Sequence, residues 1–542
     1  MKKRLLALFL TSIIFVGCNE VEDTKDDTIE DISIETQSMN LKYINLSMVK
    51  ANTINPIENT KESVGHILSL VYDGLFTIDE GYNVVPQLVS EYNIHSDGLV
   101  MDITLEDAMW HNGEKVTSRD VQYTVNLIKS MVESPYNVFT SNIDSINVID
   151  DKNLKINFKE KYAFNIDNLI FPILCEADVL NPDEAIGNGK YKIENYKSRK
   201  GMFLRVNKEY YDASEVAKKD IVVSVVPEPS ALSSMLLALK SDISSVYLND
   251  LSSFYEDEFE IKKFEGRDFE TVIFNYDNPF FRDINFRQAL ISSIDRDSIL
   301  DEAYMSDARI INFPLNSTSK YYDESISTIE FDTQKAKEFI EEIDLKIINS
   351  DVEITESPNL FGEDIILDNI ERVDLDNQDE IEETEDTRLS LNNLNLKILV
   401  NRENGERVKT AHIIRTGLRD IGINAIVYEK EGIELDIALQ NKDYDLALIG
   451  WELSSIPDIS NIIQSIGYTD QKLQGYLSSL KIASSESQIK DIYMATQNYL
   501  NSNALYIPLV IRDDYLVYTS RLKGQINPNS FDIYEGISNL DI

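Results

Sequence analysis

The sequence predicts a mixed α/β protein, because strand-like runs alternate with helical patterns along most of its length. The clearest strand patterns are apolar or alternating runs at 41–48, 100–106, 154–159, 271–276, 396–401 and 445–451. Helical periodicity lies between them, at 118–132, 286–294 and 335–343. Ser118 is placed to cap the first of these helices. Hydrophobic residues make up 43% of the 542 residues, which is enough for buried cores.

The N-terminus has the pattern of an export signal. Three basic residues at 2–4 precede a 13-residue apolar run at 5–17, which is too short to span a bilayer of about 30 Å as a helix. The run ends Phe15-Val16-Gly17-Cys18 and resembles the lipobox of bacterial lipoproteins, although Phe15 departs from the usual aliphatic residue. The resemblance implies cleavage before Cys18 and a diacylated cysteine that anchors the protein on the extracytoplasmic face of the cell membrane. The alternative is a secreted protein whose Cys18 lies in the signal by chance.

Two acidic segments are expected to be solvated. Residues 19–37 are acidic and free of aromatic side chains, which favours an extended tether. Residues 351–387 carry 15 acidic side chains, one basic and one aromatic, so we expect a mobile surface insertion at about 347–393. A calcium loop at 374–379 is disfavoured, because the glycine and terminal glutamate of an EF-hand loop are missing.

Composition and motifs exclude several functions. The chain has 94 acidic and 51 basic residues and a formal net charge of −43, which argues against nucleic acid as a partner. Two cysteines exclude a disulfide framework. No GxSxG, GxxxxGK[ST], HExxH or CxxC motif is present, so we expect no enzyme and no cofactor. The four histidines, at 66, 95, 111 and 412, lack metal-ligand spacing, so we expect no metal site.

Several motifs occur in a fixed order along the chain. Residues 70–125 contain YDGLF, the PQL step and WHNGEKVTSRDV. GNGKYKIENY (187–196), ALKSDISSV (238–246), VIFNYDNPFFRDINFRQALISSIDRDSI (272–299) and DYDLALIGW (443–451) follow. Together they resemble extracytoplasmic solute-binding proteins of family 5, the oligopeptide, dipeptide and nickel group that serves ABC importers. One departure is Glu106-Asp107, where the family has a basic residue at the strand end.

The resemblance implies a bilobal fold of the type II periplasmic-binding-protein kind, with a hinge and an extra domain that enlarges the first lobe. It implies these parts: 1–17 signal peptide; 18–37 lipidated Cys18 and acidic tether; 38–73, 186–273 and 513–542 first lobe (domain I); 74–185 extra domain (domain II); 274–512 second lobe (domain III), which carries the acidic insertion.

The same resemblance nominates residues of the ligand cleft. Peptide-binding members hold the ligand's main chain by hydrogen bonds and neutralise its ammonium with an aspartate three residues after a tryptophan. Here the tryptophan is Trp451 and the aspartate position is Ser454, a neutral hydroxyl that cannot match a buried ammonium as a carboxylate does. A shifted backbone would let Glu452 or Asp458 substitute, or the ligand has no free amino terminus there. The candidates are Asn59, Thr60, Asn275, Tyr276, Trp451, Glu452, Ser454, Ser455 and Asp458. None of the four histidines lies in the mapped cleft elements.

The function implied by the resemblance is that of a transport receptor. A monomeric lipoprotein would bind a peptide or peptide-like solute between its lobes and deliver it to an ABC permease, whose ATPase is a separate cytoplasmic subunit. A nickel chelate held by a few contacts stays open as the ligand. The alternative, motivated by Ser454 and the acidic insertion, is a signalling or adhesion lipoprotein that keeps the fold without transport.

Overall fold

The computed structural model describes residues 41–177, 185–255, 257–344, 348 and 394–542. The signal segment, Cys18, the acidic tether and the insertion apart from Ile348 lie outside these residues. The mixed α/β prediction is confirmed, because every strand and helix pattern named above overlaps an observed element. The pattern at 271–276 covers only the end of its strand, which begins at Phe259. No helix in the described ranges is long and apolar enough to cross a membrane.

The first sheet, here called the N-terminal sheet, joins strands from distant parts of the chain. Its order is β1 (Ile44–Val49), β10 (Ile221–Val226), β9 (Gly201–Val206) and β8 (Tyr191–Lys197). β1 is parallel to β10, and the other pairs are antiparallel. Three short helices accompany it in the same half of the chain: α1 (Glu62–Leu68), α3 (Ser230–Leu237) and α4 (Leu248–Leu251).

A second sheet is antiparallel throughout, in the order β4 (Val89–Ile94), β5 (Val100–Leu105), β7 (Asn153–Phe158), β6 (Ile143–Val148). Beside it are the ribbon β2 (Phe76–Ile78) and β3 (Val84–Pro86), helix α2 (Ser118–Ser130), and the 3-10 turns η1 (Val138–Thr140) and η2 (Asp167–Leu169). Buried and half-buried residues alternate along β5 and β7, as expected for strands with one face in a core.

The N-cap of α2 differs from the sequence prediction. The cap is Thr117, whose backbone N–H donates to the Asp120 carboxylate at 2.7 Å. Ser118 is already helical, and its hydroxyl donates to the carbonyl of Asp150. The prediction of Ser118 as the cap is therefore wrong by one residue. The helix nevertheless begins with the expected carboxylate, Asp120, in its first turn. A negative charge there stabilises the helix by its interaction with the helix dipole.

The third sheet, here called the long sheet, has the order β11 (Ile243–Ser245), β17 (Ile507–Thr519), β12 (Phe259–Phe274), β16 (Leu446–Glu452), β14 (Asn395–Asn401) and β15 (Asn424–Lys430), with β13 (Ala308–Ile310) paired to β17. Its accompanying helices are α5 (Ile284–Ser292), α6 (Arg296–Ser298), α7 (Thr333–Glu341), α9 (Gly405–Asp420), α10 (Gly432–Gln440), α11 (Ser460–Ser465), α12 (Gln471–Lys481) and α13 (Glu486–Ser502). Short turns η3 (Pro279–Arg282), η4 (Ile299–Ala303) and η6 (Ile537–Asn539) complete the described elements.

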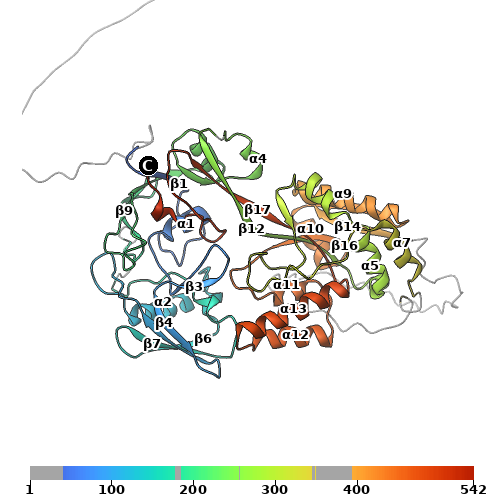
Figure 1. The fold of residues 1–542 in the computed structure, drawn as a ribbon, viewed down its shortest axis with the longest axis horizontal. Coiled ribbons are helices and arrows are strands. Elements are labelled where there is room, and N and C mark those ends of the chain that lie inside the picture. The colour runs from blue at the N-terminus through green and yellow to red at the C-terminus, as the bar shows by residue number, and fades with distance from the viewer. Residues whose placement is uncertain (1–40, 178–184, 256, 345–347, 349–393) are drawn as a thin grey trace, which may run out of the picture. The chain divides into compact units, whose positions relative to one another are not determined.

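Strands β12 and β17 run side by side over most of their length (Figure 1). Residues Phe259–Glu265 of β12 pair with Asp513–Thr519 of β17, and the register then shifts between Glu265 and Phe269. Beyond the shift, β12 pairs with β16 on its other side. A β-bulge of this kind bends a strand and increases its twist. The two strands therefore continue through an irregular point at 266–268.

The hydrophobic cores are divided at the same place as the long sheet, near the bulge of β12. One core gathers side chains from 44–243 and 516–540, including Leu46, Met101 and Leu516. Two further cores lie around the part of the long sheet beyond the bulge. Phe164 is an exception: it follows the antiparallel sheet in sequence, but it is fully buried in a core with Tyr493 and Leu505.

Candidate binding cavity

A cavity of 940 Å³ is lined by side chains that lie far apart in the sequence. They come from the stretches 56–78, 86–106, 136–139, 170–172, 190–215 and 530–537, together with Arg267, Ser454 and Ser455. The volume is near the upper end of the range of about 300–1,000 Å³ found for small-molecule sites. The cavity is therefore large enough for a short peptide or a molecule of similar size.

Two sequence motifs meet at one wall of the cavity. The YDGLF segment supplies Asp73, whose backbone N–H donates to Asn188 Oδ1 of the GNGKY segment at 2.9 Å. The N–H groups of Asn188 and Gly189 donate in turn to the carbonyl of Val71. A Cβ on Gly187 would lie 2.0 Å from that carbonyl oxygen, so glycine is needed for the close approach. This packing fixes Asp73 and Lys190 beside the cavity.

Asp73 is buried and accepts two side-chain hydrogen bonds, from Gln87 Nε2 at 3.0 Å and from the Tyr210 hydroxyl at 2.9 Å. Burial raises the pKa of the carboxyl to about 7, and the bond from Tyr210 and the charge of Lys190 oppose the shift only in part. Lys190 Nζ itself lies 2.8 Å from Glu215 Oε2. This wall thus holds a buried carboxyl whose pKa is raised well above its ordinary value.

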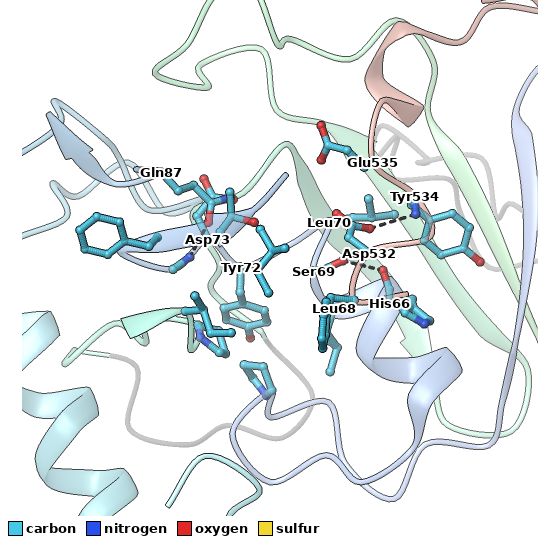
Figure 2. A pocket seen from close by; sticks show the side chains of 18 of the residues that line it. His66, Leu68, Ser69, Leu70, Tyr72, Asp73, Gln87, Asp532, Tyr534 and Glu535 are labelled. Atoms are coloured by element: carbon cyan, nitrogen blue, oxygen red, sulfur yellow. Dashed lines mark hydrogen bonds between the residues drawn. The ribbon is translucent and has the colours of Figure 1, made fainter. Parts of the chain in front are cut away.

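A second wall is formed by the segment that follows β17. Asp532 Oδ1 accepts the backbone N–H of Tyr534 at 2.9 Å, and the Tyr534 ring lies edge-on to His66 with ring centres 6.3 Å apart. Figure 2 shows Asp73 and Gln87 on one side of the view and Asp532, Tyr534 and Glu535 on the other. Burial raises the pKa of both Asp532 and Glu535.

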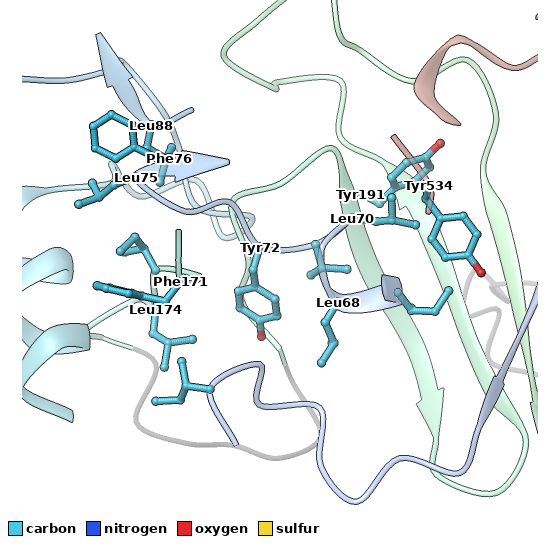
Figure 3. Close-up of a cluster of buried hydrophobic side chains, with 14 of the residues drawn as sticks. Leu68, Leu70, Tyr72, Leu75, Phe76, Leu88, Phe171, Leu174, Tyr191 and Tyr534 are labelled. Atoms are coloured by element: carbon cyan, nitrogen blue, oxygen red, sulfur yellow. The ribbon is translucent and has the colours of Figure 1, made fainter. Parts of the chain in front are cut away.

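An apolar layer supports both walls. The chain from Leu68 to Phe76 is almost continuously buried, and Figure 3 shows Leu68, Leu70, Tyr72, Leu75 and Phe76 from it among other buried hydrophobic side chains. Because packed side chains hold their neighbours in fixed rotamers, this layer positions the polar groups that the same segment presents.

Arg267 lies at the bulge of β12 and faces both the cavity and the long sheet. Its guanidinium carbon lies 4.3 Å from the ring centre of Phe531, and its Nη1 donates to the carbonyl of Leu453 at 3.2 Å. Its other terminal nitrogen forms an ion pair with Glu452. Arg267 thus connects the 530–537 segment with the end of β16.

Three predicted site residues line this cavity: Asn59, Ser454 and Ser455. Asn59 Nδ2 and Oδ1 bond to the backbone of Lys61, at 2.8 Å and 3.1 Å, and close the turn before α1. Ser454 is exposed, and its hydroxyl accepts the N–H of Ile456 at 3.1 Å. Thr60 is also exposed, but it is not among the lining residues.

Trp451, Glu452 and Asp458 line a neighbouring cavity of 250 Å³, which Ser454 and Ser455 also border. Trp451 is half-buried and stacks on Phe269 with ring centres 6.2 Å apart. Asp458 accepts the Tyr162 hydroxyl at 2.7 Å and the N–H of Ser460 at 2.9 Å.

Asn275 and Tyr276 lie apart from the residues that line these two cavities. Asn275 Nδ2 donates to the carbonyls of Lys442 and Tyr444, and the Tyr276 hydroxyl donates to the carbonyl of Leu505 at 2.7 Å. Both side chains are buried. Both side chains thus bond to backbone carbonyls of the protein itself, near the end of β12.

Sequence reasoning missed most of the polar wall, namely Asp73, Gln87, Lys190, Tyr210, Asp532 and Glu535. Asp73 and Lys190 lie within quoted motifs, so the motifs themselves were an available signal. The statement that none of the histidines lies in the cleft elements is wrong for His66, which lines the cavity because α1 follows directly after the Asn59 turn. Among the described residues, no cluster of three or more His, Cys, Asp or Glu side chains is arranged to hold a metal ion.

Comparison with known sequences places this geometry in context. A family model described as "Bacterial extracellular solute-binding proteins, family 5 Middle" matches residues 83–473, well over half of the chain. An ABC transporter peptide-binding protein of Brucella ovis is 26% identical over 302 residues, which cover 53% of this chain and 56% of that protein. The chain thus matches little more than half the length of such relatives. The oligopeptide-binding protein AppA of Bacillus subtilis is 20% identical over 98% of both chains.

Solved structures share the fold. The ABC transporter substrate-binding protein CtaP of Listeria monocytogenes superimposes with a TM-score of 0.71 at 20% identity, over 93% of this chain and 99% of that one. NikZ of Campylobacter jejuni, solved in complex with Ni(L-His), gives 0.63 at 23% identity, over 93% and 100%. The bilobal fold implied by the motifs is confirmed by these neighbours. Their family consists of solute-binding proteins of ABC transporters and not of enzymes. This chain therefore belongs to the family 5 bacterial extracellular solute-binding proteins.

Proposed function

We propose that this protein is the substrate receptor of an ABC importer and that it binds a peptide or peptide-like solute in the 940 Å³ cavity. The observation that carries the proposal is the composition of the cavity wall. Residues 56–78 and 530–537 meet Arg267, Ser454 and Ser455 there, next to the bulge where β12 and β17 continue from one part of the long sheet to the other.

The proposed domain division follows the N-terminal and antiparallel sheets, whereas the long sheet has strands in both proposed lobes. The first lobe comprises 38–73, 186–273 and 513–542, the extra domain 74–185, and the second lobe 274–512. In support, the N-terminal sheet uses only strands of the first set, and the antiparallel sheet only strands of the second. Closure of two lobes on a ligand expels water and strengthens polar contacts in the cleft. A loaded, closed form also gives the permease a shape to distinguish from the empty form.

The ligand class follows from the relatives and from the size of the cavity. AppA is named an oligopeptide-binding protein, and NikZ was solved with nickel–histidine. A cavity of 940 Å³ admits either kind of solute. We favour a peptide, because polar groups with fixed hydrogen bonds, such as Asp73, Gln87 and Tyr210, line the wall.

The membrane anchor is part of the same proposal. Cys18 would carry the lipid, and the acidic tether would hold the folded body away from the anionic surface by charge repulsion. The receptor would then stay close to its permease, which raises its effective concentration there.

Tryptophan fluorescence tests the binding site directly, because the chain has two tryptophans. Trp110 is buried and its indole N–H donates to Asp120 at 3.3 Å, whereas Trp451 is half-buried beside the candidate site. Titration with a mixture of short peptides should change the emission of the wild type and of Trp110→Phe. Trp451→Phe should give no signal change, because the remaining Trp110 lines neither cavity.

Mass spectrometry of small molecules released from the unfolded protein identifies the natural ligand. Recovery of peptides would support the proposal. Recovery of a nickel chelate would make the chelate, instead of a peptide, the ligand of the receptor. An empty protein with no fluorescence response to peptides or nickel–histidine would contradict the proposal and favour the signalling or adhesion alternative.

A further inference from the structure

The cavity wall carries a surplus of negative charge. Two side chains with permanent positive charge line it, and both are already held by carboxylates: Lys190 by Glu215 at 2.8 Å, and Arg267 by Glu452. Further carboxylates line the cavity without a lysine or arginine nitrogen within 4 Å in the described part of the chain. These are Glu62, Asp73, Glu106, Asp212, Asp532 and Glu535.

Asp532 and Glu535 are the pair best placed to meet a ligand. They lie three residues apart on the 530–537 segment, and both are half-buried. Asp73 accepts side-chain hydrogen bonds from Gln87 and Tyr210, whereas Asp532 accepts the backbone N–H of Tyr534 at Oδ1. Burial raises the pKa of Glu535, and the charge of Asp532 raises it further. The charge of Lys190 lowers the pKa of both carboxyls, and that of His66 lowers the pKa of Asp532, but burial outweighs these effects and Lys190 is already paired with Glu215. Two partly desolvated carboxylates are costly to keep ionised, and a positive group of a ligand would offset that cost.

The opposite side of the cavity offers no free carboxylate for such a group. Ser454 stands where peptide-binding members would have the aspartate, and Glu452 is paired with Arg267. Asp458 accepts bonds from Tyr162 and from the backbone of Ser460. A positive group on that side would have to share a carboxylate that already has protein partners.

We propose that the cavity selects a ligand with an ammonium or guanidinium group and that Asp532 and Glu535 hold this group. The charge surplus and the absence of a carboxylate at 454 point in the same direction. The inference rests on the proposed function, because it assigns a charge class to the solute of the same cavity. In this proposal Asp532 and Glu535, on the segment after β17, take the role that an aspartate at position 454 would have.

A panel of tetrapeptides of equal length tests the charge class by calorimetry on the purified full chain. The probes are Lys-Ala-Lys-Ala with a free amino terminus, tetra-alanine with a free amino terminus and an amidated end, tetra-alanine blocked at both ends, and acetylated Glu-Ala-Glu-Ala. We expect affinity to fall in that order, with at least about a tenfold difference between the first and the third peptide. Higher ionic strength should reduce this difference only modestly, since the carboxylates are partly buried.

The variant Asp532→Asn with Glu535→Gln tests the assigned residues. It should lose about tenfold or more in affinity for the lysine peptide and leave the blocked tetra-alanine unchanged or slightly tighter. The matched control is Asp491→Asn with Glu338→Gln, which removes the same two charges at exposed positions on α13 and α7. The control should bind every probe as the wild type does, and thermal melting checks that both variants fold.

The outcomes separate this inference from the function beneath it. Equal affinity for all four peptides, or a preference for the acidic one, would overturn the charge assignment and leave the peptide receptor intact. A lysine preference that survives in the Asp532/Glu535 variant would overturn the residue assignment. Failure of every peptide to bind the folded wild type would overturn both the inference and the peptide part of the proposed function.

Discussion

Asp73 shows what burial does to a single residue of the cavity wall. Its carboxyl is almost inaccessible, accepts hydrogen bonds from neutral donors, and has a pKa raised to about 7 by desolvation. In the unfolded chain the same group would titrate near pH 3.9. Between these two values the folded state binds more protons than the unfolded state does. Its contribution to stability is therefore full below about pH 4 and is lost as the pH rises through 7.

Replacement of Asp73 by Asn should flatten the pH dependence of stability. At about 1.4 kcal/mol per pKa unit, the wild type should lose on the order of 4 kcal/mol relative to Asp73→Asn between pH 4 and pH 7. Urea unfolding at several pH values in this window measures the difference. Asp167, whose pKa burial also raises to about 7, is unchanged in the variant, so the comparison isolates Asp73. Parallel stability curves for the two proteins would contradict the prediction.

At the scale of elements, the bulge of β12 joins the two parts of the long sheet. A Cβ on Gly266 would lie 2.7 Å from the carbonyl oxygen of Arg512 and 3.0 Å from the Asp514 carboxylate. Both belong to β17, the neighbouring strand. The two backbones can approach this closely only because residue 266 has no side chain. Arg267, which follows, is thereby held between Phe531 and the end of β16.

Gly266→Ala should therefore destabilise the protein by about 1–3 kcal/mol, because the added methyl forces the paired strands apart. We also expect weaker ligand binding, since Arg267 would shift with the backbone. The matched control is Gly475→Ala in α12, where an added Cβ meets nothing within 4 Å. There the same change should stabilise by about 0.4–1 kcal/mol. Equal effects of the two substitutions, measured by chemical denaturation, would argue against a close approach at the bulge.

At the scale of the whole molecule, residues 162–164 connect the segment after the antiparallel sheet with the region of α11–α13. Phe164 is fully buried and lies edge-on to Tyr321 with ring centres 6.4 Å apart. The N–H of Ala163 donates to the carbonyl of Lys481 at 2.9 Å, and Tyr162 bonds to Asp458. These contacts hold the proposed extra domain against the proposed second lobe.

Phe164→Ala should cost about 3–5 kcal/mol, as truncation of a buried aromatic residue usually does. Because the contact joins two proposed domains, hydrogen exchange should also speed up on both sides, in 160–170 and in α12. Phe331→Ala, at a side chain 49% exposed, serves as the control and should change stability by less than about 0.5 kcal/mol. A large loss of stability with faster exchange on one side alone would mean that Phe164 does not couple the domains.

Anchoring of the whole molecule is tested at Cys18. Cys18→Ser removes the thiol that would carry the lipid, so the protein should move from the membrane fraction to the soluble extracytoplasmic fraction. Its ligand affinity should stay as in the wild type, because residue 18 precedes the folded body. Fractionation with labelled palmitate checks the location, and titration with peptides checks the affinity. Membrane association that persists without the thiol would show that the anchor lies elsewhere.

The sequence by itself determined the local elements and the family. Periodicity predicted β1, β5, β7, β14 and β16 to within a few residues, because alternation and apolar runs report the local backbone directly. The ordered motifs predicted the bilobal fold, which the structural neighbours confirm. The sequence also showed that Ser454, which lines the cavity, departs from the aspartate of peptide-binding members, because this departure depends on one position of one motif.

Only the tertiary structure decided which side chains surround the cavity. Asp73 and Asp532 are separated by more than 450 residues, yet both line it, because the chain returns after β17 to lie beside α1, where Tyr534 contacts His66. It also decided that Glu452 and Asp458 are committed to Arg267 and Tyr162. The physical reason is that periodicity encodes which face of an element is buried, whereas the charge balance of a cavity depends on which distant elements share it.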